Sequence, residues 1–198
     1  MQLKPLVSAS ALLASSMLPF QAQALDYSYR IYNNTLVVDA AGLFEVNEPD
    51  LFNSWLNHLP ASLHPEGVKM AFVFNSRGGN VYGAIAVGQY IDQRHYNTGV
   101  EAGGRCVSAC VMAWSAGAHK SATPDTSIGV HQASITGINE AGSTYERPMP
   151  EGTNYIANWL RQTGAPTSVI SKLVATPPSD VAWLSLDELR EWNVHITY

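Results

Sequence analysis

The residues of this sequence that could do chemistry are found in two glycine-rich turns and at one histidine. Gly78-Gly79 follows an apolar run, and a second turn leads from Gly103 to Ser108. Paired glycines let the backbone turn sharply and leave N–H groups free to hold a negatively charged oxygen. A serine becomes a nucleophile when a base within hydrogen-bond reach accepts its proton. Ser108 is therefore the candidate nucleophile, and His131 is the candidate general base.

Taken alone, Ser108 has a simpler interpretation. It begins a nearly continuous apolar segment, residues 108–116, which predicts a buried helix. Serine is common at helix N-caps, because its hydroxyl accepts a backbone N–H. Order and spacing favour the chemical role: the glycine pair precedes Ser108 by one predicted helix and strand, and His131 falls at the end of the next strand.

Alternating strands and helices are expected to position these residues. Periodicity predicts strands at 29–40 (turning at Asn33-Asn34), 68–74, 98–102, 127–132 and 195–198. It predicts helices at 49–59, 81–91, 108–116, 154–162, 167–175 and 186–192. Residues 137–152, which are broken by Gly and Pro, are predicted to be a mobile loop. This order is typical of right-handed βαβ units around a largely parallel sheet.

The composition indicates one globular domain and excludes one class of partner. The chain has 198 residues, of which 46% are hydrophobic and 14% charged, enough to build a real core. Its formal net charge is −5, and no run of Lys or Arg occurs. Nucleic acid and anionic membrane surfaces need a clustered basic face, so neither is expected as a partner.

The N-terminus has the pattern of an export signal. Lys4 is followed by an uncharged apolar stretch at 6–20 and by the small-x-small sequence Ala22-Gln23-Ala24. We expect cleavage after Ala24, which leaves a single domain at 25–198 in the periplasm or outside the cell. An uncleaved anchor is the alternative, although the stretch is short for a bilayer span of about 20 residues.

Several motifs together resemble the proteolytic subunit of Clp protease, within the wider ClpP/crotonase superfamily. The resemblance covers about residues 36–194. It rests on Asn75-Ser76-x-Gly78-Gly79, on Ser108-Ala109 followed by Ala116-Gly117, and on Pro124 followed by His131-Gln132. It implies a ClpP/crotonase-like α/β fold of repeated βαβ units with a largely parallel central sheet.

The same resemblance implies the roles of the site residues. Ser108 would be the nucleophile and His131 the general base, and the N–H groups of Gly79 and Ala109 would form the oxyanion hole. The reaction would be acyl transfer, with neither a cofactor nor a metal. The remaining histidines show no metal-ligand spacing.

A third member of the triad is less well defined. The family places an aspartate shortly before an aromatic-Leu-Ser stretch, which is residues 183–185 here. Asp180 stands one residue farther upstream than that pattern, after two prolines. Asp180 either completes the triad or only turns the chain, and in the second case Ser108 and His131 would work as a dyad.

Two cysteines flank the candidate nucleophile. Cys106 and Cys110 are the only cysteines of the chain. Export places them in an oxidising compartment, which favours a disulfide between them. The alternative is a pair of buried free thiols that act as small apolar residues.

The leading functional hypothesis is an exported serine peptidase that acts on peptides or unfolded proteins without ATP. No ATPase partner is expected, because the compartment lacks ATP. Homo-oligomerisation stays open, because the segment that builds rings in the family is here broken by Gly and Pro. A catalytically weak or inactive binding protein of the periplasm is the alternative. A lysine base is disfavoured, because the lysines after the signal (Lys69, Lys120 and Lys172) do not match that pattern.

Overall fold

The structure is a computed structural model, and it describes residues 23–64 and 68–198. Most of the predicted export signal, residues 1–22, lies outside the described residues. Gln23 and Ala24, with which the predicted signal ends, lie beside strand β2 (Thr35–Phe44). Ala24 forms a parallel bridge with Leu43, and the Leu43 N–H donates to the Gln23 carbonyl (2.9 Å).

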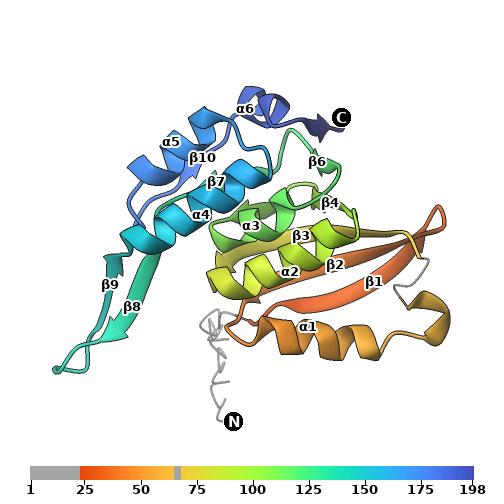
Figure 1. Ribbon diagram of the computed structural model, residues 1–198, viewed down its shortest axis with the longest axis horizontal. Coiled ribbons are helices and arrows are strands. Elements are labelled where there is room, and N and C mark those ends of the chain that lie inside the picture. The colour runs from red at the N-terminus through yellow and green to blue at the C-terminus, as the bar shows by residue number, and fades with distance from the viewer. Residues whose placement is uncertain (1–22, 65–67) are drawn as a thin grey trace, which may run out of the picture.

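A nine-stranded sheet forms the centre of the molecule (Figure 1). Besides β2, its strands are β1 (Asp26–Tyr32), β3 (Met70–Gly79), β4 (Asn97–Val100), β5 (Arg105–Val107), β6 (Lys120–Ala122), β7 (Ser127–Val130), β10 (Ala182–Trp183) and β11 (Val194–Ile196). β1 is antiparallel to β2 and β10 is antiparallel to β7, while the other pairings are parallel. The predicted α/β architecture with a largely parallel sheet is therefore confirmed.

Strand β3 divides the sheet into two branches. On one side it pairs with β2 along its length. On the other side its first half pairs with β4, whereas Ser76 pairs with Cys106 of β5. Strand β5 in turn pairs in parallel with β7. The carboxyl ends of β3, β5 and β7 consequently lie at one edge of this branch, and Gly79, Ser108 and His131 are found at those ends.

The helices pack against one another and against the sheet. They are α1 (Glu48–Asn57), α2 (Val81–Gln93), α3 (Ala109–Ser115), α4 (Pro150–Gln162), α5 (Thr167–Ala175) and α6 (Leu186–Glu191), with a 3-10 turn, η1 (Ala61–Leu63). Helix α2 packs between α1 and α3 (Figure 1). All seven residues of α3 are buried, as expected for a helix that is apolar all round. Within the described ranges, no helix is long and apolar enough to cross a bilayer.

The segment at 137–152 differs from its prediction as a mobile loop. Its larger part belongs to a β-hairpin of β8 (Ser134–Ile138) and β9 (Thr144–Pro148), and its last residues begin α4. The Asn139 side chain closes the turn by accepting the N–H groups of Ala141 and Ser143. Pro148 ends a strand and Pro150 begins a helix, and both positions tolerate proline. The hairpin projects from the body as an arm (Figure 1).

Candidate active site

Ser108 occupies a backbone conformation that is rare for a residue with a side chain. It lies between β5 and α3 with φ 56° and ψ −126°. Its hydroxyl makes no capping hydrogen bond to the helix, so the simpler interpretation as an N-cap is not met. Its N–H donates to the Gly129 carbonyl of β7 (3.0 Å). Strained residues of this kind persist only where the surroundings hold them, and they cluster at active sites, as in the sharp strand-to-helix turns that present nucleophilic serines.

The glycine pair lies directly against this turn. A Cβ on Gly78 would be 2.8 Å from the Ser108 Cβ and 3.1 Å from the Ala109 nitrogen, so a side chain has no room there. Both glycines have positive φ, 107° for Gly78 and 120° for Gly79. The buried Ser76 hydroxyl accepts the Gly78 N–H (3.1 Å) and stabilises the turn. The two loops that carry the predicted oxyanion donors, Gly79 and Ala109, are thus adjacent.

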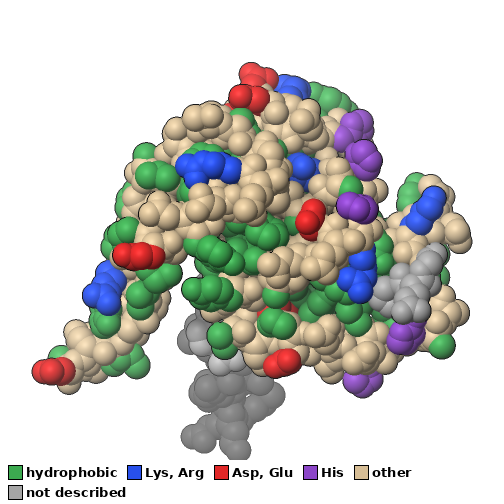
Figure 2. All heavy atoms as spheres, in the orientation of Figure 1, with side chains coloured by type: hydrophobic (Ala, Val, Ile, Leu, Met, Phe, Trp, Pro, Cys, Tyr) green, Lys and Arg blue, Asp and Glu red, His purple; other side chains and the backbone are tan. Residues whose placement is uncertain are grey.

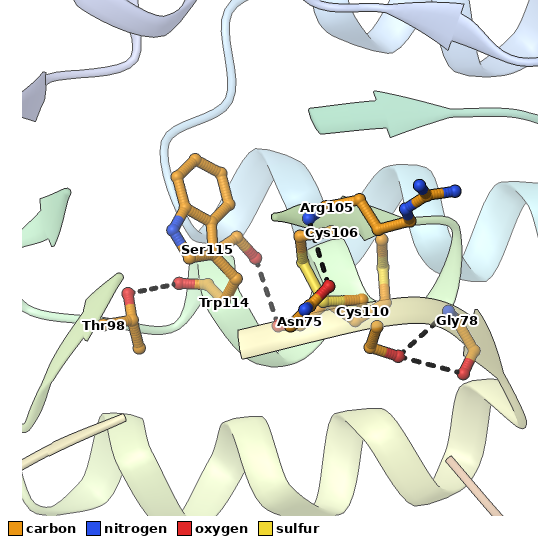
Figure 3. Close-up of a disulfide and its surroundings, with 10 residues drawn as sticks. Asn75, Gly78, Thr98, Arg105, Cys106, Cys110, Trp114 and Ser115 are labelled. Atoms are coloured by element: carbon orange, nitrogen blue, oxygen red, sulfur yellow. Dashed lines mark hydrogen bonds between the residues drawn. A yellow bond between two sulfur atoms is a disulfide. The ribbon is translucent and has the colours of Figure 1, made fainter. Parts of the chain in front are cut away.

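The Asn75 side chain links the two turns. The Asn75 amide donates to the Glu101 carboxylate (2.8 Å), and its oxygen accepts the Arg105 N–H (3.3 Å). Asn75 belongs to β3 and Arg105 begins β5, so this side chain joins the strand of the glycine pair to the strand of the nucleophile. Figure 3 shows the contact beside the disulfide.

The two cysteines form a disulfide around the nucleophile, as predicted for an oxidising compartment. Cys106 of β5 and Cys110 of α3 are bonded, with their Cα atoms 5.2 Å apart. Both residues are fully buried. In Figure 3 they meet above β3, with Asn75 on one side and Gly78 on the other. The bridge therefore spans Ser108 from two residues before it to two residues after it.

His131 directly follows β7, the strand beside β5. Val107 pairs with Gly129, which places Ser108 and His131 at the ends of neighbouring parallel strands. The His131 Nδ1 lies 2.8 Å from the Gln132 carbonyl oxygen. Because a carbonyl oxygen can only accept, Nδ1 carries the proton and Nε2 of the neutral ring keeps a free lone pair. Among the described residues no hydrogen bond joins this ring to the Ser108 hydroxyl. Such contacts are often long before substrate binds.

Asp180 lies in an exposed turn before β10. Its N–H donates to the Pro177 carbonyl (3.0 Å), and its carboxylate accepts the N–H of Val181 (2.7 Å). Over the ranges that the structure describes, this carboxylate makes no hydrogen bond to His131. The structure therefore brings together the two predicted oxyanion turns, Ser108 and the strand end of His131. The turn of Asp180 leads into β10, which pairs with β7 through Ala182 and Val130.

Two lysines of the described residues, Lys172 and Lys120, have different surroundings. The Lys172 ammonium is held by the Glu188 carboxylate (2.7 Å) and the Trp183 carbonyl (2.8 Å). Lys120 begins β6, and burial lowers the pKa of its ammonium. In the part of the chain that the structure covers, no cluster of three His, Cys, Asp or Glu side chains could hold a metal ion.

A hollow with apolar walls lies between the β8–β9 arm and the body. Figure 2 shows hydrophobic side chains on both sides of it. Tyr82, in the first turn of α2 just after the glycine pair, and Tyr155 of α4 are 66% and 44% exposed. Their rings lie 6.0 Å apart. Exposed apolar patches beside a site are typical of surfaces that bind a ligand or another chain.

This arrangement is a ClpP-like fold of the ClpP/crotonase type. Its largely parallel sheet branches at β3, and the glycine pair, the serine and the histidine lie at neighbouring strand ends. The fold predicted from the sequence motifs is therefore confirmed.

Solved structures with this fold are distant in sequence. A serine-to-alanine mutant of the 1510-N membrane-bound stomatin-specific protease superposes with a TM-score of 0.59 and 16% identity over 81% of this chain and 77% of that one. A lysine-to-alanine mutant of the same protease, in complex with a substrate peptide, gives 0.58 and 17% over 81% and 73%. A ClpP1 mutant from Listeria monocytogenes gives 0.55 and 17% over 81% and 90%. No family model and no curated protein matches the sequence.

Three residues at the site have roles that sequence reasoning did not assign. Asn75, Ser76 and Gly78 belong to the motif from which the resemblance was drawn. Asn75 bonds to β5, Ser76 bonds to Gly78 within β3, and Gly78 lies against Ser108. The signal was present in part: a polar pair at the end of an apolar strand indicates side chains that hold the turn that follows.

Proposed function

We propose that this chain is an exported serine peptidase that works without ATP, a cofactor or a metal. Ser108 is its nucleophile and His131 its general base, and the N–H groups of Gly79 and Ala109 form the oxyanion hole. The observation that carries the proposal is the conformation of Ser108: a serine at positive φ, between β5 and α3, which does not cap its helix and packs against Gly78.

The reaction is acyl transfer in two halves. The Ser108 hydroxyl oxygen attacks the substrate carbonyl carbon while Nε2 of His131 takes the hydroxyl proton. The oxyanion of the tetrahedral intermediate is stabilised by the two backbone N–H groups. The C–N bond then breaks, the amine leaves with the proton from His131, and an acyl ester remains on Ser108. Water deprotonated by His131 hydrolyses that ester and restores the hydroxyl.

The substrate class is an extended or unfolded peptide. The apolar hollow between the arm and the body offers a surface for such a segment (Figure 2), and so does the exposed ring pair of Tyr82 and Tyr155. One neighbour with this fold was solved with a substrate peptide. Homo-oligomerisation is a further part of the proposal, because a two-stranded arm is marginal on its own in water and Ile138 at its tip is 71% exposed.

A catalytically weak or inactive binding protein is the second candidate. It is favoured by the exposed Asp180, whose carboxylate accepts the N–H of its own neighbour, Val181. In this case the site would hold a peptide without cleaving it.

Labelling with a fluorophosphonate probe separates the two candidates. The full chain is incubated with the probe beside Ser108→Ala, His131→Ala and a control, Ser115→Ala, which removes a buried hydroxyl from the other end of α3. We expect the wild type and Ser115→Ala to be labelled, Ser108→Ala not to be, and His131→Ala to react roughly 10²–10⁴-fold more slowly. A folded wild type without Ser108-dependent labelling would support the binding protein instead.

A further inference from the structure

We propose that the Cys106–Cys110 disulfide is the positioning element of the nucleophile, so that the reactivity of Ser108 requires the oxidised bridge while the fold does not. The inference rests on the proposed function of Ser108 and extends it to the control of the site. The two cysteines would affect the reaction by positioning Ser108, and they would not contact the substrate.

The placement of the bridge carries the argument. One sulfur is anchored in the middle of β5 and the other in the first turn of α3, and Ser108 is the middle residue of the ring that they close. The positive φ of Ser108 is held by three constraints: the N–H bond to Gly129, the contact with Gly78, and this ring. Of these, only the ring covalently fixes the distance between the two ends of the turn, so its loss lets Ser108 relax toward negative φ.

The fold has support that is independent of the bridge. Strand β5 keeps its ladder with β7, and every residue of α3 is buried in the core. Both cysteines belong to that core, where reduced thiols pack as small apolar side chains. We therefore expect reduction to loosen one turn and leave the sheet and helices in place.

The reduction itself is a two-electron step. A dithiol such as dithiothreitol attacks one sulfur through its thiolate, the S–S bond breaks, and a mixed disulfide forms. The second thiol of the reagent then attacks the mixed disulfide, and the reagent leaves as a cyclic disulfide. Cys106 and Cys110 remain as thiols, with the two protons that the dithiol gave up. Because these are the only two cysteines of the chain, a dithiol has no other target in it.

The test compares the rate of Ser108 labelling by a fluorophosphonate in the oxidised chain, in the dithiothreitol-reduced chain and in Cys106→Ser/Cys110→Ser. Near-UV circular dichroism and the melting temperature report the fold of each form. We expect the reduced chain and the double variant to react roughly 10–100-fold more slowly, which is the scale of a nucleophile misplaced by about 1 Å. For a peptide substrate the loss should fall on kcat, with KM nearly unchanged.

Two controls keep the outcomes distinct. The double variant should be insensitive to dithiothreitol, and reoxidation of the wild type should restore its rate.

Equal labelling of folded oxidised and reduced chains would overturn this inference and leave the proposed function intact. Absence of labelling in the oxidised chain would instead refute the proposed function. If the double variant does not fold, the reduced wild type still decides, since its fold is measured in the same sample. Reduced wild type that unfolds would also overturn the inference, because the bridge would then be part of the general stability.

Discussion

Replacement of Gly78 by alanine tests whether the glycine pair and the nucleophile turn are one mechanical unit. The added methyl group would lie 2.8 Å from the Ser108 Cβ and 2.8 Å from the Val107 carbonyl oxygen, closer than real Cβ contacts come. The backbone there also has φ 107°, a region that residues with a side chain rarely adopt. Something has to shift, and the structure places Ser108 and its turn next to the new group.

The magnitude follows from two contributions. Backbone strain at such a φ is worth roughly 1–3 kcal/mol, and overpacking adds roughly 1–3 kcal/mol. The sum, about 2–6 kcal/mol, corresponds to a decrease in melting temperature of about 5–20 °C for a domain of this size. If Ser108 is displaced by several tenths of an ångström or more, we expect its labelling by a fluorophosphonate to slow by about 10²-fold.

Gly164→Ala is the matched control. Gly164 also has a positive φ, 81°, but no heavy atom lies within 4 Å of its added Cβ. This variant should lose only the strain contribution, about 1–2 kcal/mol, and should label at the wild-type rate. The reasoning is refuted if Gly78→Ala is folded and labels like Gly164→Ala, because the glycine pair and the nucleophile turn would then be mechanically independent.

Two further predictions concern carboxylates. Asp180→Asn should change kcat/KM by less than about threefold, because the Asp180 carboxylate accepts the Val181 N–H and makes no hydrogen bond to His131. In a complete triad the same change lowers kcat by about 10⁴-fold. Steady-state kinetics of the wild type and this variant therefore distinguish the two cases. Burial raises the pKa of Glu48, which accepts hydrogen bonds from the Tyr27 hydroxyl and the Glu45 N–H, so the folded state keeps this proton to higher pH than the unfolded chain does. That contribution to stability is full below the unfolded pKa of 4.5 and is lost as the pH rises through the folded pKa. The stability of the wild type relative to Glu48→Gln, measured by urea unfolding between about pH 4 and pH 8, should therefore decrease with pH, and a flat difference would contradict the assignment.

Long periodic segments of this chain were predictable, and short strands were not. The helix at 167–175 has the predicted bounds, and α1, α2, α3 and α6 begin and end within two residues of theirs. Strands β5, β6 and β10 were missed because two or three residues do not show a period. They exist because neighbouring strands supply their hydrogen bonds. Strand β3 runs through the glycine pair, past the predicted end at residue 74, because β2 continues to pair with it.

The candidate site was predictable as far as spacing reaches. Ser108, His131 and the two oxyanion turns could be proposed from order along the chain, since each follows a strand and parallel strands end at one edge. The hydrogen bond from Asn75 to β5 and the contact of Gly78 with Ser108 depend on which strands are neighbours. That order reflects the division of the sheet at β3, which short-range patterns do not encode.

The hydrogen bond of His131 gives the proposed mechanism a specific weakness. A backbone carbonyl at Nδ1 selects the tautomer that a general base needs, and it does so whether or not an aspartate is present. A neutral carbonyl brings no charge, however, so it offsets the imidazolium that forms after proton transfer less than a carboxylate would. On the proposed mechanism the enzyme therefore depends more on the placement of Ser108 and the oxyanion N–H groups than a complete triad does. A disulfide around the nucleophile and a glycine pair packed against it are the features that such a dependence requires.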